Sequence, residues 1–349
     1  MNRKVFFSPM ANNLSNRVKA AMVREEISHR EPEFTELLQE VRRKIKDLAG
    51  GDEGYAVIMF TGSGTAALDS AIGSLSKNSH LAILNNGVYG QRLINIARQY
   101  GFHIEEVVFH GYPELTKIEE VMSSTDITHM LMVHHETSSG LLNPLKQIGD
   151  MCKKYKKELI VDAISSIAVQ NIDVIKDNIS FMIGSSNKGI GGAEGLSFIV
   201  AKKTELNNVD SRKQSYYLDL RSNYEKQERG QTLFTPAVRI FSGLNEALDE
   251  LKEETIENRI RRFNRIAEKL RNGLKRLGYE ILTDLEHPSN TVTLVNLGNI
   301  GYQELYTILK KEGFVIYSSA ETTAFRLCTF GDLWMKDIQK FLEALEALK

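Results

Sequence analysis

The stretch from Tyr55 to Thr65, Tyr-Ala-Val-Ile-Met-Phe-Thr-Gly-Ser-Gly-Thr, joins a run of apolar residues to a turn of glycine and small polar residues. A continuously apolar run of this length is typical of a β-strand that is covered on both faces. A helix is expected to follow from Ala66 to about Leu75, so the stretch predicts a strand, a glycine turn and a helix in succession. In that arrangement, free backbone N–H groups and the helix dipole can hold a phosphate group.

The same alternation of strand and helix continues along the chain. Residues 17–49 are predicted to form two helices with a break near residues 30–32. Six further strands are expected after Tyr55–Phe60, at 81–84, 104–109, 130–134, 158–162, 179–183 and 196–200, with helices at 91–100 and 146–156. Repeated strand and helix units predict an α/β fold with a mainly parallel seven-stranded sheet, helices on both faces and ligands at the carboxyl ends of the strands.

The pattern of predicted helices and strands changes beyond about residue 240. A long helical region at 244–278, strands at 291–295, 314–317 and 325–328, and helices at 302–312 and 335–348 predict a smaller α+β domain. The long helical region is rich in arginine, but interleaved glutamates favour a solvated face over a nucleic-acid-binding helix. We therefore expect an N-terminal segment of residues 1–16, a large domain at 17–240 and a small C-terminal domain at 241–349.

Composition narrows the function classes. The chain has 349 residues, of which 42% are hydrophobic and 26% charged, and its 44 basic and 45 acidic side chains nearly cancel. This balance argues against a nucleic-acid or acidic-membrane partner. The two cysteines, Cys152 and Cys328, cannot build a disulfide framework, which fits a reducing cytoplasm. We expect neither a signal peptide nor a membrane-spanning segment, because no apolar run approaches about 20 residues.

A single lysine, Lys188, stands among small residues in the stretch 183–192, Ile-Gly-Ser-Ser-Asn-Lys-Gly-Ile-Gly-Gly. Small neighbours let the backbone approach a flat cofactor, and a lysine held out of water or near a cation loses its proton and becomes nucleophilic. We interpret Lys188 as the Schiff-base lysine of an enzyme that uses pyridoxal 5'-phosphate (PLP). A solvated loop lysine would have the same local sequence, so this interpretation depends on the rest of the chain.

The chain supplies the other groups that PLP needs: a phosphate cradle, a platform for its ring and an acid facing its pyridine nitrogen. Ser63, Gly64 and Thr65 can form the cradle, and Tyr89 can stack on the ring. Asp162, at the end of an apolar strand, can keep the ring nitrogen protonated. Each residue also has a simpler explanation as a turn former, a packing residue or a helix cap. Their joint occurrence at strand ends favours the PLP site.

These residues belong to motifs that resemble those of a known family. The motifs are Gly62–Thr65, Asn86–Gly90, Val133–Pro144, Val161–Ser166, Ser185–Lys188, Phe234–Thr235 and Phe325–Leu327. Together they are similar to the motifs of the class V aminotransferases of PLP fold type I, over nearly the whole chain. The resemblance implies a PLP-dependent transaminase. Within the family the motifs look most like those of enzymes that move an amino group from 2-aminoethylphosphonate to pyruvate.

The resemblance also implies roles for individual residues. It gives Lys188 and the strand-end aspartate the roles described above, and it places the Thr137 hydroxyl near the phenolic oxygen of PLP and Asn187 at the phosphate. Thr235 matches a residue that reaches the phosphate of the other subunit, which implies a homodimer with the active site at the subunit interface. Arg326 matches an arginine that binds the acidic group of the substrate, and a guanidinium suits carboxylate and phosphonate alike.

Two segments depart from the family pattern. The chain has Ser8–Asn13 where the family usually has a Thr-Pro-Gly-Pro-like segment, and Thr235–Arg239 where it has a Thr-Ser-Pro-Thr-His-like segment. Both are expected to border the substrate. A different donor, such as serine or alanine, with glyoxylate or pyruvate as acceptor, therefore stays open as an alternative.

Two other functions fit parts of the sequence, a dinucleotide-binding turn and a metal site. Gly62-x-Gly64-x-x-Ala67 after a strand also fits the dinucleotide-binding turn of an NAD-dependent dehydrogenase, but the next strand ends in asparagines and not in the acid that binds the ribose. His134 and Glu136 could share a strand face as metal ligands, yet no third ligand cluster stands out, so we expect no metal.

Two further rivals stay within PLP chemistry. A PLP-binding regulator is possible, although no fused DNA-binding segment is visible. A cysteine desulfurase needs a nucleophilic cysteine on a mobile loop, whereas Cys328 lies inside an apolar strand and is expected to be a buried structural thiol.

Overall fold

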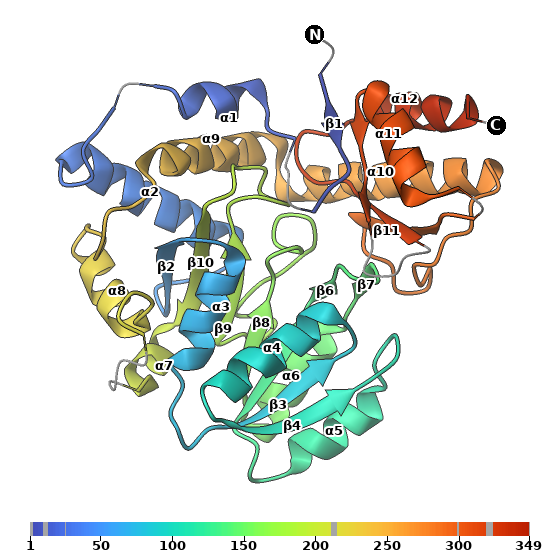
Figure 1. Cartoon of the computed structure of the whole chain (residues 1–349). Coiled ribbons are helices and arrows are strands. Elements are labelled where there is room, and N and C mark those ends of the chain that lie inside the picture. The colour runs from blue at the N-terminus through green and yellow to red at the C-terminus, as the bar shows by residue number, and fades with distance from the viewer. Residues whose placement is uncertain are drawn as a thin grey trace.

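The computed structural model describes residues 3–9, 13–24, 26–210, 215–298, 300–318 and 324–348. The chain forms a large α/β part around one long sheet and a smaller part built mainly from its C-terminal third (Figure 1). The two parts meet beside the carboxyl ends of the parallel strands, where the residues expected to form the active site lie.

The large sheet has seven strands in the order β2-β10-β9-β8-β5-β3-β4. Their bounds are β2 (Tyr55–Thr61), β3 (His80–Asn85), β4 (His103–Val108), β5 (His129–Val133), β8 (Glu158–Asp162), β9 (Phe181–Ser185) and β10 (Leu196–Lys202). Strand β10 runs antiparallel to both of its neighbours, and the remaining pairs are parallel. The expected mainly parallel seven-stranded sheet is confirmed.

Helices cover both faces of this sheet, which explains why its central strands are apolar without alternation. In β2, Val57 and Met59 pack into the core on one face, whereas Ile58 and Phe60 pack into the core on the other. The first core includes side chains of α1 (Asn16–Ala21), α2 (Pro32–Leu48), α5 (Leu115–Ser123), α6 (Leu145–Tyr155) and α9 (Val238–Glu254). The second includes side chains of α3 (Gly64–Gly73), α4 (Val88–Gln99), α7 (Lys203–Asn208) and α8 (Leu220–Glu228).

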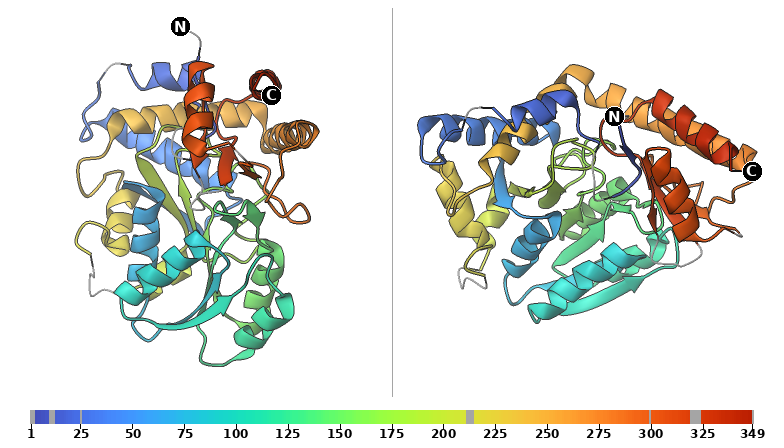
Figure 2. Two further views of the ribbon diagram at one scale, coloured as in Figure 1. Left: turned by 45° about the vertical axis from the view of Figure 1, so that its right-hand side comes forward. Right: turned by 45° about the horizontal axis from the view of Figure 1, so that its top comes forward.

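The smaller part contains α10 (Ile256–Arg276), β11 (Val292–Asn296), α11 (Tyr302–Lys311), β12 (Phe314–Val315), β13 (Tyr317–Ser318), β14 (Ala324–Cys328) and α12 (Met335–Glu346). Its three-stranded antiparallel sheet has the order β11-β14-β13. The N-terminal strand β1 (Val5–Phe6) pairs in parallel with β12, so the start of the chain lies against its C-terminal elements (Figures 1 and 2). A short hairpin of β6 (His135–Glu136) and β7 (Leu141–Leu142) follows β5.

The helical region expected at 244–278 is helical, but it is divided into two helices, α9 and α10. Thr255 has a φ of 66°, which no helix continues through, and its side chain accepts a hydrogen bond from the Asn258 N–H at the start of α10. Helix α9 packs into the core of the large sheet through Phe241, Leu244 and Leu248. The division into residues 1–16, 17–240 and 241–349 stays a prediction, and we propose Thr255 as its second boundary.

Two other expectations concern single elements, and a third concerns membrane-spanning helices. The break between the first two helices is longer than expected, since α1 already ends at Ala21. The single strand expected at 314–317 is two short strands, β12 and β13, that pair with different partners. Among the described residues, no helix is both long enough and apolar enough to cross a membrane.

Candidate active site

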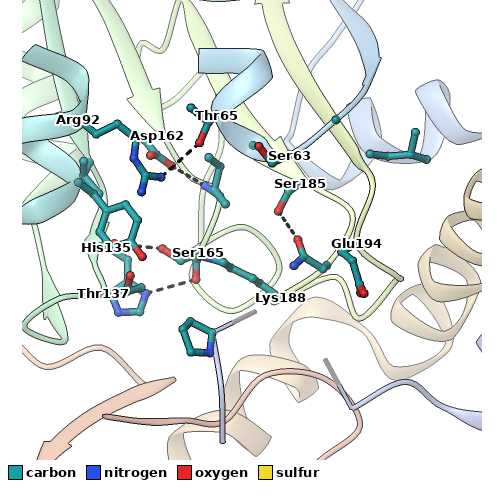
Figure 3. A pocket seen from close by; sticks show the side chains of 18 of the residues that line it. Ser63, Thr65, Arg92, His135, Thr137, Asp162, Ser165, Ser185, Lys188 and Glu194 are labelled. Atoms are coloured by element: carbon teal, nitrogen blue, oxygen red, sulfur yellow. Dashed lines mark hydrogen bonds between the residues drawn. The ribbon is translucent and has the colours of Figure 1, made fainter. Parts of the chain in front are cut away.

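A cavity of about 620 Å³ opens at the carboxyl ends of the parallel strands (Figure 3). Nine of the residues singled out in the sequence line it: Ser63, Gly64, Thr65, Tyr89, Thr137, Asp162, Asn187, Lys188 and Arg326. They come from the ends of five strands of the large sheet and from β14 of the smaller part. The fold therefore brings together residues that span more than two hundred and sixty positions of the sequence, from Ser63 to Arg326.

The glycine turn after β2 forms one wall of this cavity. Ser63 is the N-cap of α3, and its side chain makes no capping hydrogen bond, so the first N–H groups of this ten-residue helix are open toward the cavity. A Cβ atom on Gly64 would lie 2.3 Å from Cδ1 of Ile164, so only glycine allows this close approach. Helix-start N–H groups together with the helix dipole attract a phosphate. The turn therefore fits the expected cradle.

Asp162 is a buried carboxyl group at the end of β8. Its residue is only 4% exposed, and its Oδ1 accepts a hydrogen bond of 3.0 Å from the Ile164 N–H. Burial raises the pKa of Asp162 to about 6, although the Ile164 N–H and the positive charges of Lys188 and Arg92 oppose that change. A protonated ring nitrogen placed against this carboxylate would supply the close positive charge that it lacks.

Lys188 lies in a tightly shaped loop after β9. Its φ of 63° is in the left-handed region, and the loop is close-packed, because a Cβ atom on Gly189 would lie 2.1 Å from the Ile167 carbonyl oxygen. The Lys188 ammonium lies 5.8 Å from the centre of the Tyr89 ring and 5.9 Å from that of Phe330. The lysine therefore reaches the cavity between two aromatic rings.

Several polar atoms around the cavity are buried without a hydrogen-bond partner among the described residues. They are Oγ1 of Thr137, Nε of Arg326 and Nε2 of His135. Arg326 is held by weak contacts, from its NH1 group to the Thr137 carbonyl at 3.3 Å and from its NH2 group to the Ser318 carbonyl at 3.4 Å. Buried polar groups normally have partners. Unsatisfied donors and acceptors at one cavity therefore indicate a polar ligand there.

His135 lies between His134 and Glu136, the two residues considered as metal ligands from the sequence. Burial lowers its pKa to about 3, so the ring is neutral, and its Nδ1 lies 3.3 Å from the Ser165 carbonyl oxygen. With the proton on Nδ1, Nε2 is left as an acceptor. Among the described residues, no group of three or more His, Cys, Asp or Glu side chains is placed to hold a metal ion.

Two residues near Tyr89 were not expected at the cofactor site: Arg92 was not singled out, and Glu136 was considered only as a metal ligand. Arg92 lines the cavity, with its guanidinium 4.6 Å above the Tyr89 ring and its NH1 group donating to Thr65 Oγ1 at 3.3 Å (Figure 3). Glu136 is fully buried, and its carboxylate accepts hydrogen bonds from the backbone N–H groups of Tyr89 and Gly90, at 3.0 and 3.2 Å. The position of Arg92 one helical turn after Tyr89 was a signal that could have revealed it.

The remaining residues lie outside the cavity or at its border. Thr235 is exposed and does not line the cavity, so its contact with a second subunit stays a prediction. In the atypical segment Ser8–Asn13, Pro9 lines the cavity, whereas residues 10–12 lie outside the described part of the chain. Asn13 is buried and bonds through its amide to both the N–H and the carbonyl of Phe6. Glu194 and Tyr317 complete the lining without having been singled out.

Comparison with known proteins agrees with this geometry. The family model for aminotransferase class V matches residues 10–329. The chain is 32% identical to a 2-aminoethylphosphonate–pyruvate transaminase of Phocaeicola vulgatus, over 100% of this chain and 99% of that protein. It is also 32% identical to a bifunctional phosphonoacetaldehyde hydrolase/aminoethylphosphonate transaminase of Clostridioides difficile, of which it spans 56%.

A solved structure shows the same fold. The crystal structure of ureidoglycine–glyoxylate aminotransferase from Bacillus subtilis superposes with a TM-score of 0.91 at 24% identity, over 100% of this chain and 93% of that one. The fold is that of the PLP-dependent fold type I aminotransferases, as the motifs implied. The family match over most of the chain, together with relatives above 30% identity along its full length, confirms the resemblance. The chain is an aminotransferase of the class V family.

Proposed function

We propose that this aminotransferase uses PLP bound in the described cavity to move an amino group from 2-aminoethylphosphonate, or a related small acidic amine, to pyruvate. The observation that carries the proposal is that Lys188, Asp162 and Arg326 all line one cavity. Lys188 supplies an amine, Asp162 a carboxylate for the ring nitrogen of the cofactor, and Arg326 a guanidinium for the acidic end of the substrate. A PLP-dependent transamination needs these three groups.

The cavity lining suits the cofactor at each of its polar groups. The open N–H groups at the start of α3, with Ser63 and Thr65, suit the phosphate, and Asn187 lies on the same loop as Lys188. The unpartnered hydroxyl of Thr137 suits the phenolic oxygen, and Tyr89 offers a ring platform. When bound, PLP supplies an electron sink that stabilises negative charge at the substrate carbon next to the nitrogen.

The protein's own residues then have separate tasks. The Lys188 amine moves the proton to and from the reacting carbon of the substrate, because it is the one lysine among the described residues that line the cavity. The Asp162 carboxylate would hold a proton on the ring nitrogen of bound PLP. Arg326, whose Nε has no partner in the described chain, binds the acidic end of the donor or acceptor and orients it.

The donor is inferred from relatives. Curated relatives that match this chain over nearly their whole length bear the name 2-aminoethylphosphonate–pyruvate transaminase, at 32% identity. The alternative of serine or alanine as donor, with glyoxylate or pyruvate as acceptor, is kept because Pro9 lies at the cavity in the segment that departs from the family pattern. We also propose a homodimer in which Thr235, exposed on this chain, contributes to the partner's phosphate site.

The rival functions have less support. The dehydrogenase alternative fails, because the chain belongs to an aminotransferase family and β3 ends in Asn85 without an acid. Cys328 is unsuited to desulfurase chemistry, since burial raises the pKa of its thiol to about 12 and keeps it protonated.

Attachment of the cofactor is tested first. After incubation with PLP and reduction with borohydride, mass spectrometry of the digested protein should find the cofactor on the peptide that contains Lys188. Lys188→Ala should abolish this label, whereas Lys202→Ala, a lysine at the end of β10 outside the cavity, should retain it. Labelling of another lysine with equal yield would reject the assignment.

The donor is tested on the PLP-bound protein. Rapid loss of its visible absorbance with 2-aminoethylphosphonate, and recovery with pyruvate, is the expected result. Fast reaction with serine or alanine, but none with the phosphonate, would reject the donor and leave transamination in place.

A further inference from the structure

A buried arginine lies behind the lysine loop, outside the cavity. Arg259, in the first turn of α10, is only 6% exposed and does not line the active site. Its NH1 group donates to the carbonyl oxygens of Gly189 and Ile190, at 3.1 and 3.0 Å. These are the two residues that directly follow Lys188. A guanidinium is seldom buried unless it is paired, so the position of this one calls for a specific role.

The backbone that Arg259 holds is unfavourable by itself. Lys188 has a φ of 63°, and a residue with a side chain adopts this conformation only where its surroundings impose it. Ser186 fixes the other side of the loop, since its hydroxyl donates to the Ala193 carbonyl and accepts from the Leu196 N–H at 3.4 Å. Without the guanidinium, the buried Gly189 and Ile190 carbonyls would lose their donors, and the backbone would be free to relax away from the left-handed conformation.

Glu254 connects this arginine to the smaller part of the protein. Its carboxylate accepts from Arg259 Nε at 2.7 Å, and it pairs with Arg262 through two hydrogen bonds of 2.6 and 3.0 Å. Arg262 in turn donates to the Leu333 carbonyl at 2.8 Å and lies 4.7 Å over the ring of Trp334. Glu254 is the last residue of α9, and both arginines lie in the first two turns of α10.

The same network therefore reaches Lys188 from two directions. Arg259 holds the backbone that follows the lysine, and Arg262 holds the segment just after Phe330, whose ring lies 5.9 Å from the Lys188 ammonium. Rigid support behind an active-site group matters because a displacement of about 1 Å lowers the rate by about 100-fold.

We propose that Arg259, anchored by Glu254, is a positioning residue for Lys188: it maintains the left-handed backbone at the lysine and so aims the amine at the reacting atoms. The ion pairs that Glu254 makes with Arg259 and Arg262 extend this support to the Phe330–Trp334 segment. The inference rests on the proposed function only in assigning the chemistry to Lys188. The backbone claim stands by itself.

The test compares Arg259→Met with Arg261→Met, a matched control on the same helix at an exposed position. In the cofactor-free full-length protein, hydrogen–deuterium exchange should become about 10-fold faster or more for the amides of residues 186–193 in Arg259→Met only. In the PLP-bound protein, kcat should fall about 10- to 100-fold with KM for the donor nearly unchanged, and the pH at which the visible absorbance titrates should shift. The control should behave as the wild type in every measurement.

Arg259→Lys is included in case the methionine variant does not fold. It retains a positive charge beside Glu254 but lacks the fork that serves a carboxylate and two carbonyls together, so its exchange and kcat should change in the same direction. Wild-type exchange in residues 186–193 and wild-type kcat in a folded Arg259 variant would overturn the inference. If the wild type instead fails to bind PLP through Lys188, the proposed function is wrong, whereas the exchange measurement still decides the backbone claim.

Discussion

Asp162 should make the cofactor-free protein less stable as the pH rises. The carboxyl group is 4% exposed, and burial raises its pKa from the ordinary 3.8 to about 6. Between these two values the folded protein holds a proton that the unfolded chain has released. Because the folded state then binds more protons, the free energy of unfolding falls as the pH rises through this window and stays low above it. Replacing Asp162 with asparagine removes this effect.

The size of the effect follows from the two pKa values. The difference between 3.8 and about 6 corresponds to about 3 kcal/mol of stability that the wild type loses. About 2 kcal/mol of this loss should fall between about pH 4.5 and about pH 7.5. Asparagine keeps an oxygen that can accept the Ile164 N–H bond now made by Oδ1, so the variant should fold, and at neutral pH it should be the more stable protein.

The assay is urea unfolding of both cofactor-free proteins across this pH range. We expect the stability advantage of Asp162→Asn to grow with pH and to level off above about pH 6. Asp47→Asn, at a largely exposed position, is the matched control and should show no such growth. Added PLP should stabilise the wild type more than the variant, because only the carboxylate can pair with a protonated ring nitrogen. If the difference in free energy of unfolding between wild type and Asp162→Asn is constant with pH, or shrinks as the pH rises, the burial argument is refuted.

Three further substitutions follow from the cavity walls. Glu136→Gln leaves one acceptor oxygen, so either the N–H groups of Tyr89 and Gly90 or the N–H of Ser138 loses its acceptor, and PLP affinity, measured by titration, should fall about 10-fold or more. Gly64→Ala puts a Cβ atom 2.3 Å from a side-chain carbon of Ile164, which should cost about 1–3 kcal/mol and lower the Tm by several degrees in a thermal melt. Arg326→Lys loses the planar fork, so KM for an acidic donor should rise about 10- to 100-fold in steady-state kinetics, with a smaller change in kcat; an unchanged KM would remove Arg326 from substrate binding.

Much of the fold could be predicted from apolar runs alone. Six of the seven strands of the large sheet lie where continuous or nearly continuous apolar runs occur, because helices cover both faces and the side chains of a central strand are largely buried. The exception is the edge strand β4, which contains Glu105 and Glu106 and is mostly exposed or half-buried. The break within the helical region at 244–278 was not predicted, for a local reason. Thr255 has a side chain that suits a helix start, but helical periodicity continues on both sides of it and hides the break.

The sequence could predict which candidate site residues come together where a reactive side chain lies at or just after the end of a strand. Asp162 and Lys188 follow apolar runs directly, and parallel topology brings such positions to one edge of the sheet. The supporting residues were not predictable in this way. Glu136 stands next to Thr137 in the sequence, but its contact with the start of α4 depends on how the loop after β5 folds across the sheet. Arg259 is one of many arginines on α10, and only the packing of α10 against the lysine loop distinguishes it.

Features that are unfavourable in the ligand-free chain gather around one cavity. The carboxyl group of Asp162 is buried without a full charge partner, Arg326 and Thr137 have buried polar atoms without hydrogen bonds, and Lys188 has a left-handed backbone. Positive φ angles also occur elsewhere, as at Thr255, but among the described residues only the surroundings of this cavity combine all three features. A group with a cationic ring nitrogen, an acceptor oxygen and a second acidic end would satisfy the first two features together. We infer that this site is complete only with its ligands bound, and that the contacts of Arg259 and Glu136 help to maintain it.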